Sequence, residues 1–162
     1  MAKVLYVNPE KCVGCMTCVL ACSLEHGNTI GPAQSRIFPV RLKSQVINIP
    51  MVCRQCTRPL CALSCPVGAI TRNEATGAMI VEPTLCIGCW ICVNACPLGG
   101  ITLDTDAGHA VKCDLCGGDP LCVKVCAYGA LEYLPEEEVS VGRKREAIGR
   151  LAELLETLHR PL

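Results

Sequence analysis

The residues best suited to chemistry in this chain are its 16 cysteines, which fall into four groups of four. Two groups, CVGCMTCVLAC and CIGCWICVNAC, share the spacing C-x2-C-x2-C-x3-C. The other two, CRQCTRPLCALSC and CDLCGGDPLCVKVC, keep the first and last intervals and lengthen the middle one. This regularity predicts that every cysteine is a metal ligand. The groups contain Cys12, Cys15, Cys18 and Cys22; Cys53, Cys56, Cys61 and Cys65; Cys86, Cys89, Cys92 and Cys96; and Cys113, Cys116, Cys122 and Cys126.

The spacing favours a cubane iron–sulfur cluster. Three cysteines on a tight loop can direct their sulfur atoms into one small volume and bind three irons of a cubane. The fourth cysteine lies on the following helical turn and faces away, and in two-cluster ferredoxins it completes the neighbouring cluster. Sixteen thiolates therefore predict four 4Fe-4S clusters as cofactors, bound by groups that work in reciprocal pairs.

The sequences beside the groups indicate how they pair. The segments AITR and MIVE, between the second and third groups, are typical of two short strands joined by a polar turn. The segments KVLYVNPEKC and GALEYLP repeat these flanks at the two ends of the cysteine-rich region. We therefore pair the second group with the third, and the first with the fourth. The predicted ligand sets are site 1 (Cys12, Cys15, Cys18, Cys126), site 2 (Cys113, Cys116, Cys122, Cys22), site 3 (Cys53, Cys56, Cys61, Cys96) and site 4 (Cys86, Cys89, Cys92, Cys65).

Structural zinc and disulfides are the alternatives to clusters. Zinc sites use separated CxxC pairs, which do not explain a third cysteine three positions further on. Disulfides belong to oxidising compartments, and the N-terminal segment MAKVLYVNPEK shows no signal-peptide pattern. We therefore expect a cytoplasmic protein whose cysteines hold clusters.

Composition excludes two classes of partner. The chain has 15 basic and 15 acidic residues, so no overall field attracts nucleic acid or an anionic membrane. No apolar stretch approaches the roughly 18 to 20 residues that cross a bilayer, and we expect no membrane span.

Aromatic residues make up only 3% of the chain, which indicates that bound clusters must supplement a small core.

The elements that position the cysteines must be short. We expect an α+β fold of two interlocked bacterial-ferredoxin-like units, built from short antiparallel hairpins and short helices, with a C-terminal amphipathic helix. Residues 1–26 and 110–134 form the outer, discontinuous unit, and residues 53–109 form the inner one. Residues 27–52 are a connecting or covering segment, in which RIFPVRL and VINIP predict short strands over the inner unit or against a partner. Residues 135–162 form a helical tail.

In this order the groups resemble those of the four-cluster, ferredoxin-like electron-transfer subunits that accompany molybdenum or tungsten oxidoreductases, formate dehydrogenases, some hydrogenases and carbon monoxide dehydrogenase. The resemblance extends over about residues 3–134 and is most specific in CVGCMTCVLAC, CRQCTRPLCALSCPVGAI, CIGCWICVNACPLGGI and KCDLCGGDPLCVKVCAYGAL. The chain departs from the pattern at Ser23 and Ala127, which replace the prolines seen at Pro66 and Pro97. Its fourth group also lacks the long loop of larger relatives.

The resemblance implies a function without catalysis by this chain. Such a subunit carries single electrons between a catalytic subunit and a second redox protein in anaerobic metabolism, so we expect no catalytic residues. Among possible partners, a tungsten or molybdenum aldehyde oxidoreductase is favoured over carbon monoxide dehydrogenase or a hydrogenase. The alternatives are a free-standing polyferredoxin electron carrier and a protein that stores or assembles clusters.

Several other residues carry weaker signals. The basic residues Arg54, Arg58, Lys112 and Lys124 either raise cluster potentials or are ordinary solvated charges. His26 and His109 are expected at the surface.

The tail carries an apolar stripe on a predicted helix at residues 140–158. The stripe packs on the chain itself or docks on a catalytic subunit or a second copy. Its members are Ile148, Leu151, Leu155 and Leu158.

Overall fold

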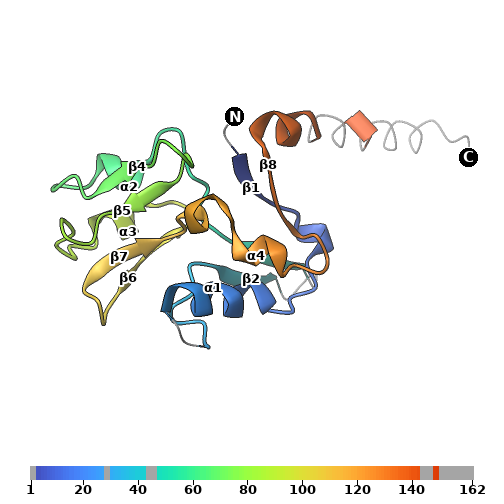
Figure 1. The fold of residues 1–162 in the computed structure, drawn as a ribbon, viewed down its shortest axis with the longest axis horizontal. Helices are drawn as coiled ribbons and strands as arrows, with labels where there is room; N and C mark the ends of the chain where they lie inside the picture. The colour runs from blue at the N-terminus through green and yellow to red at the C-terminus, as the bar shows by residue number, and fades with distance from the viewer. Residues whose placement is uncertain (1–2, 28–29, 43–46, 143–147, 150–162) are drawn as a thin grey trace, which may run out of the picture.

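The structure, a computed structural model, describes residues 3–27, 30–42, 47–142 and 148–149 (Figure 1). These residues form the predicted α+β fold of short antiparallel strand pairs and short helices. The elements in chain order are β1 (Lys3–Val7), η1 (Pro9–Lys11), α1 (Thr17–Gly27), β2 (Phe38–Leu42), β3 (Ile47–Met51), α2 (Leu60–Leu63), β4 (Ile70–Arg72), β5 (Met79–Val81), α3 (Ile91–Ala95), β6 (Ile101–Asp104), β7 (His109–Lys112), η2 (Leu115–Gly118), α4 (Leu121–Lys124) and β8 (Leu131–Pro135).

The two ends of the cysteine-rich region form one strand pair. Strands β1 and β8 run antiparallel, with Lys3 opposite Pro135 and Val7 opposite Leu131, and they lie side by side in Figure 1. Leu5 and Val7 are buried while their neighbours are less so, as expected of a strand with one face on the core. The pairing is the one predicted from the repeated flanks. It brings the first cysteine group, which follows β1, toward the fourth, which precedes β8.

Two further hairpins follow the second and third cysteine groups. The predicted pair β4–β5 places Ile70 opposite Val81. The pair β6–β7, with Asp104 opposite His109, was not predicted. Its turn is marked by Gly108, which has a φ of +73° and donates its N–H to the Asp104 carbonyl over 2.8 Å. The dipeptide Ala-Gly after two aspartates was the turn signal that could have revealed it.

The strands expected between residues 27 and 52 are present as the antiparallel pair β2–β3. They were expected over residues 53–109 or against a partner, and the structure shows in addition that β3 contacts η1 beside the first cysteine group. Ile37 and Val52, which flank the pair, belong to the same apolar cluster as Leu5. The segment therefore packs beside the first group, and its flanking residues also share a cluster with Ala78 of residues 53–109.

The third cysteine of each group lies on a helix, and these helices contact each other in pairs. Cys18 and Cys22 lie on α1, and Cys122 lies on α4. Cys61 lies on α2 and Cys92 on α3. Helix α1 contacts α4, and α2 contacts α3. The helices thus associate in the same combinations that the flanking strands predict for the groups.

The buried apolar residues form two clusters that include cysteines. The larger contains Leu5, Val7, Val19, Ile37, Val52, Ala78, Leu115 and Leu131 with Cys22, Cys113 and Cys122. The smaller contains Ile70, Met79, Ile101 and Ala110 with Cys92. Cysteines of the predicted ligand sets are therefore part of the packing, as expected of a fold whose aromatic content is low.

After β8, residues 136–142 are helical. Ile148 is 67% exposed, and the other members of the predicted apolar stripe, Leu151, Leu155 and Leu158, lie outside the described residues. Among the residues that the structure describes, no helix is long and apolar enough to cross a membrane.

Candidate metal centres

Three cavities are each lined by four cysteines from two different groups. Site 1 residues line the first, where the cysteine of the fourth group joins three of the first group: Cys12, Cys15, Cys18 and Cys126. Site 3 residues line the second, a cavity of about 230 Å³: Cys53, Cys56, Cys61 and Cys96. Site 4 residues line the third: Cys86, Cys89, Cys92 and Cys65. In each case three cysteines of one group face the last cysteine of its partner group.

The site 2 cysteines converge in the larger apolar cluster. Cys22, Cys113 and Cys122 are all buried there. Burial raises the pKa of Cys122, and the charges of Cys113, Cys116 and Cys22 raise it further. The three cysteines of the fourth group and the last cysteine of the first group are therefore close enough to repel one another as thiolates.

The same repulsion is present at the other sites. Burial, followed by the neighbouring charges of Cys15, Cys12 and Cys126, raises the pKa of Cys18 to about 11. Four thiolates directed at one another are unfavourable without a cation between them, whereas metal binding keeps such ligands deprotonated. The donor set and its convergence therefore fit an iron–sulfur cluster at each site.

The loops that carry the first cysteines share an uncommon backbone conformation. The residue two positions after the first cysteine has a positive φ in all four groups: +72° at Gly14, +48° at Gln55, +63° at Gly88 and +60° at Leu115. Two of the four are not glycine, so the conformation is imposed by the loop and not by residue preference. Alternation of right- and left-handed residues turns successive N–H groups into one concavity, a geometry found around phosphates and iron–sulfur clusters.

Backbone N–H groups also donate to the sulfurs of two predicted ligands. The N–H of Ala69 donates to Cys65 Sγ over 3.3 Å, and that of Gly100 donates to Cys96 Sγ over 3.3 Å. In both bonds the donor lies four residues after the cysteine, in a repeated segment that begins with Cys-Pro. A Cβ on Gly100 would lie 2.9 Å from Cys53 Cα, so this close approach requires glycine. Hydrogen bonds to cluster sulfurs are one of the means by which proteins adjust reduction potential.

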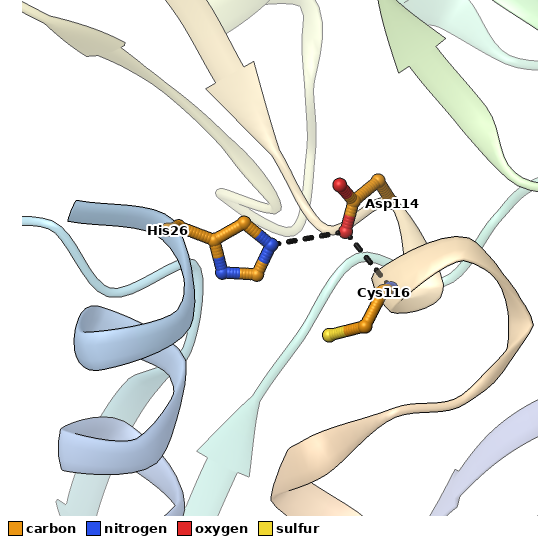
Figure 2. A group of neighbouring side chains, drawn as sticks. All are labelled: His26, Asp114 and Cys116. Carbon is orange, nitrogen blue, oxygen red and sulfur yellow. Dashed lines mark hydrogen bonds and ion pairs between the residues drawn. The ribbon is translucent and has the colours of Figure 1, made fainter. Parts of the chain in front are cut away.

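A charged network supports site 2 (Figure 2). His26 Nε2 donates to Asp114 Oδ1 over 3.2 Å, and His26 Nδ1 donates to the Cys22 carbonyl over 2.9 Å. Arg36 Nη1 lies 2.7 Å from the other carboxylate oxygen of Asp114. The Asp114 carboxylate, followed by Cys116 and Cys22, raises the pKa of His26 to about 12. Burial raises the pKa of Asp114, but His26 and Arg36 hold it well below its usual range.

The network corrects the expectation that His26 is a surface residue, because its side chain is only 11% exposed. Ligand atoms of His26, Asp114 and Cys116 lie within 4.8 Å of one another. Since Cys116 is a member of site 2 and both nitrogens of His26 contact protein oxygens, this arrangement is a support for site 2 and not a second metal centre. The role of His26 was missed because its partner, Asp114, is 88 residues away in the chain.

The four basic residues near the cysteines differ in burial. Arg54, Arg58 and Lys124 are exposed, and Lys124 pairs with Asp119, in agreement with ordinary solvated charges. Lys112 is different, because it is only 4% exposed and lines the cavity of site 3. Alternate residues of β7, Ala110 and Lys112, are buried, but this strand was not predicted, so the sequence did not separate this lysine from the others.

Electrostatic contacts also connect the sites. Burial is the main reason that the pKa of Cys122, in site 2, is raised, and the charges of the other site 2 cysteines come next. The charge of Cys18, in site 1, makes a further contribution. Burial raises the pKa of Cys113, in site 2, to about 11, with a contribution from Cys53 in site 3. Sites 3 and 4 share the contact between α2 and α3. The cysteines therefore follow one another from site 1 through sites 2 and 3 to site 4.

Two protein-family descriptions match the chain. Residues 44–135 match the family described as "4Fe-4S dicluster domain", and residues 3–24 match the one described as "4Fe-4S binding domain". Together these matches include all four cysteine groups.

Individual relatives share much of the sequence. The polyferredoxin-like subunit of an aliphatic sulfonate oxidoreductase from Pyrococcus furiosus is 43% identical, over 75% of this chain and 70% of the relative. A putative electron transport protein of Escherichia coli, YsaA, is 35% identical, over 90% of this chain and 98% of that protein. Among solved structures, a chain of the BamBC active site complex of benzoyl coenzyme A reductase matches with a TM-score of 0.49 and 27% identity, and 98% of each chain is covered.

Proposed function

Because the chain belongs to the family of 4Fe-4S dicluster, ferredoxin-like electron-transfer subunits of oxidoreductase complexes, we propose that it relays single electrons between a tungsten or molybdenum aldehyde oxidoreductase and a second redox protein. The clusters, when bound, supply the one-electron chemistry. The chain's own residues hold them at fixed positions and set the charge, hydrogen bonding and solvent exposure around them. The observation that carries the proposal is the row of cysteine-lined centres that runs from site 1 to site 4.

The proposal includes the four ligand sets and the two units. The cavities at sites 1, 3 and 4 support the sets, since each combines cysteines from two groups. The strand pair β1–β8 and the contact between α1 and α4 support an outer unit of residues 1–26 and 110–134. The contact between α2 and α3 supports an inner unit of residues 53–109.

The class of the catalytic subunit is inferred from two likenesses. The sequence resembles subunits that accompany tungsten and molybdenum enzymes, and the Pyrococcus furiosus relative is a subunit of an aliphatic sulfonate oxidoreductase. The free-standing carrier is the alternative function.

Double substitutions test the ligand sets. If Cys126 and Cys15 bind the same cluster, Cys126→Ser with Cys15→Ser should lose no more iron than Cys126→Ser alone. Cys126→Ser with Cys89→Ser should lose the iron of two clusters, because Cys89 belongs to site 4. Iron per chain in anaerobically purified protein is the measurement. Additive loss in the first pair would show that Cys126 does not complete site 1.

Purification from the native host tests the partner. The tagged chain, isolated without oxygen, should bring with it one catalytic subunit in a fixed ratio that contains tungsten or molybdenum by elemental analysis. Adding an aldehyde should then reduce the clusters, seen as the electron paramagnetic resonance signal of reduced 4Fe-4S centres, whereas the matching alcohol should not. A chain that elutes alone with full iron content would favour the free carrier, and a partner containing nickel instead would contradict the aldehyde oxidoreductase class.

A further inference from the structure

We infer that Lys112 is a positioning residue that raises the reduction potential of the cluster at site 3 by holding a buried positive charge against it. The inference rests on the proposed function only in that site 3 must hold a cluster. It concerns one residue of one site, and nothing in the ligand spacing reveals it.

The position of Lys112 relative to site 3 is the first step. Lys112 ends β7 and directly precedes Cys113, a site 2 residue, but its side chain lines the cavity of site 3 together with the four site 3 cysteines. Only 4% of the residue is exposed. Lys112 therefore lies between two neighbouring centres and directs its charge into one of them.

The hydrogen bonds of Lys112 fix its ammonium group. Nζ donates to the Met79 carbonyl oxygen and, over 3.3 Å, to Gln55 Oε1. The Gln55 amide is itself held in place, because Oε1 accepts from the Met79 N–H over 2.8 Å and Nε2 donates to the Cys113 carbonyl over 2.7 Å. Gln55 is the positive-φ residue of the second cysteine loop. The charge is thus tied to the loop that carries Cys53 and Cys56.

The charge of Lys112 lacks a protein counterion among the described residues. Both hydrogen-bond partners of Nζ are neutral oxygens, and the ion pairs found in the part of the chain that the structure describes involve other basic residues, namely Lys11, His26, Arg36 and Lys124. A buried ammonium that only neutral oxygens contact is unfavourable unless a negative charge lies nearby. The four thiolates of the cavity, with the cluster they would bind, provide that charge.

The direction of the effect follows from charge. Adding an electron makes a cluster more negative, so a fixed positive charge beside it stabilises the reduced form and raises the potential. Burial makes the interaction stronger, because little water screens it. Arg54 and Arg58 line the same cavity but are exposed, so solvent and salt screen their charges.

The chain offers a matched control in Lys11. Lys11 directly precedes Cys12, as Lys112 precedes Cys113, and it lines the cavity of site 1. Its side chain is 51% exposed, and Nζ lies 3.2 Å from Glu132 Oε1. Because the charge of Lys11 is both solvated and neutralised, its removal should leave the potential of site 1 nearly unchanged.

The test is a potentiometric titration of the full chain with its clusters, followed by electron paramagnetic resonance. Lys112→Met should shift one midpoint potential to a more negative value and leave the other three in place, while Lys112→Arg should keep the wild-type values. Lys11→Met should shift no midpoint by a comparable amount. The shifted couple is assigned by Cys56→Ser, which should alter the signal of the same couple. Unchanged midpoints in Lys112→Met, with full iron content, would overturn the inference.

The outcomes separate this inference from the proposed function. If Lys112→Met loses iron, Lys112→Gln is measured in its place, because it retains a hydrogen-bond donor without the charge. It should likewise shift one midpoint potential to a more negative value. Loss of one cluster in both neutral variants, but not in Lys112→Arg, would support the countercharge role, whereas loss in all three would assign Lys112 to packing and overturn it. A wild-type chain that binds no cluster at site 3 would instead contradict the proposed function.

Discussion

The loop that begins at Cys113 and the loop that begins at Cys86 carry equivalent cysteines in different surroundings. Cys113 and Cys122 are buried in the larger apolar cluster, and Asp114, His26 and Arg36 form a charged network beside them. In the Cys86 loop, Cys89 is exposed, and Ile87 and Trp90 are 63% and 47% exposed. Among the described residues, no ion pair borders the cysteines of this loop.

The difference shows that the ligand pattern fixes where cysteines converge but not the environment they converge in. Charge, hydrogen bonds to sulfur and solvent exposure determine the potential of a cluster. The same C-x2-C unit can therefore build an interior centre in the middle of the row and a solvent-facing centre at its end.

The largest expected effect on both loops is that of removing iron. The holo-chain should contain about 16 irons, and their removal should leave converging thiolates without a cation and cores too small to compensate. Circular dichroism should show loss of the native spectrum. Hydrogen exchange should show protection lost earlier around Ile70 and Ile101, in the smaller cluster, than around Val19 and Leu131, in the larger one. An apo-chain with an unchanged spectrum would contradict this dependence on clusters.

The next effect is specific to the Cys113 loop. Asp114→Asn removes the charge that His26 and Arg36 share, and both side chains are mostly buried at 11% and 19% exposure. Loss of hydrogen bonds to charged groups should lower the stability by about 1.5 to 3 kcal/mol. Asp119→Asn is the control, since its pair with Lys124 is exposed and should contribute less than about 1 kcal/mol. Anaerobic thermal unfolding measures both, and equal shifts would show that the network does not stabilise the loop.

The same network predicts a dependence on pH. The pKa of His26 is raised from 6.5 to about 12, so its contribution to stability is complete below about pH 6.5 and decreases as the pH rises toward 12. The pKa of Asp114 is lowered, so its contribution is present above its usual pKa and is lost in acid. The difference in unfolding temperature between wild type and Asp114→Asn should therefore become smaller from about pH 6 to about pH 9. A difference that increases over this range would contradict the assigned protonation states.

The two loops also show what the sequence could and could not predict. The cysteine groups and their repeated flanks were sufficient for the fold class and for the pairing of β1 with β8, because these depend on local spacing and alternation. The charged network was not predictable, since His26 and Asp114 meet only after α1 and α4 pack together. Lys112 was treated as one of four basic residues, because composition does not reveal which side of a strand faces a cavity.

The smallest expected effect belongs to the Cys86 loop and tests its exposure. Trp90 has a φ of +65°, as does Gly117 at the equivalent position of the Cys113 loop. Trp90→Gly removes the strain of a left-handed non-glycine residue but adds flexibility to the unfolded chain. Since these terms oppose each other and the ring is 47% exposed, the stability should change by less than about 1 kcal/mol.

The consequence of Trp90→Gly should instead be kinetic and local. Trp90 lines the cavity of site 4, so its removal should expose that site to solvent and increase the rate at which one cluster is lost in air, followed by visible absorbance and resonance spectra. Met16→Gly is the matched control, because Met16 has a φ of +66° at the equivalent position and lines the cavity of site 1. It should accelerate loss of a different cluster. If neither variant changes the rate while Asp114→Asn does, the cluster at the interior centre, and not the one at the exposed centre, is the more easily lost in air.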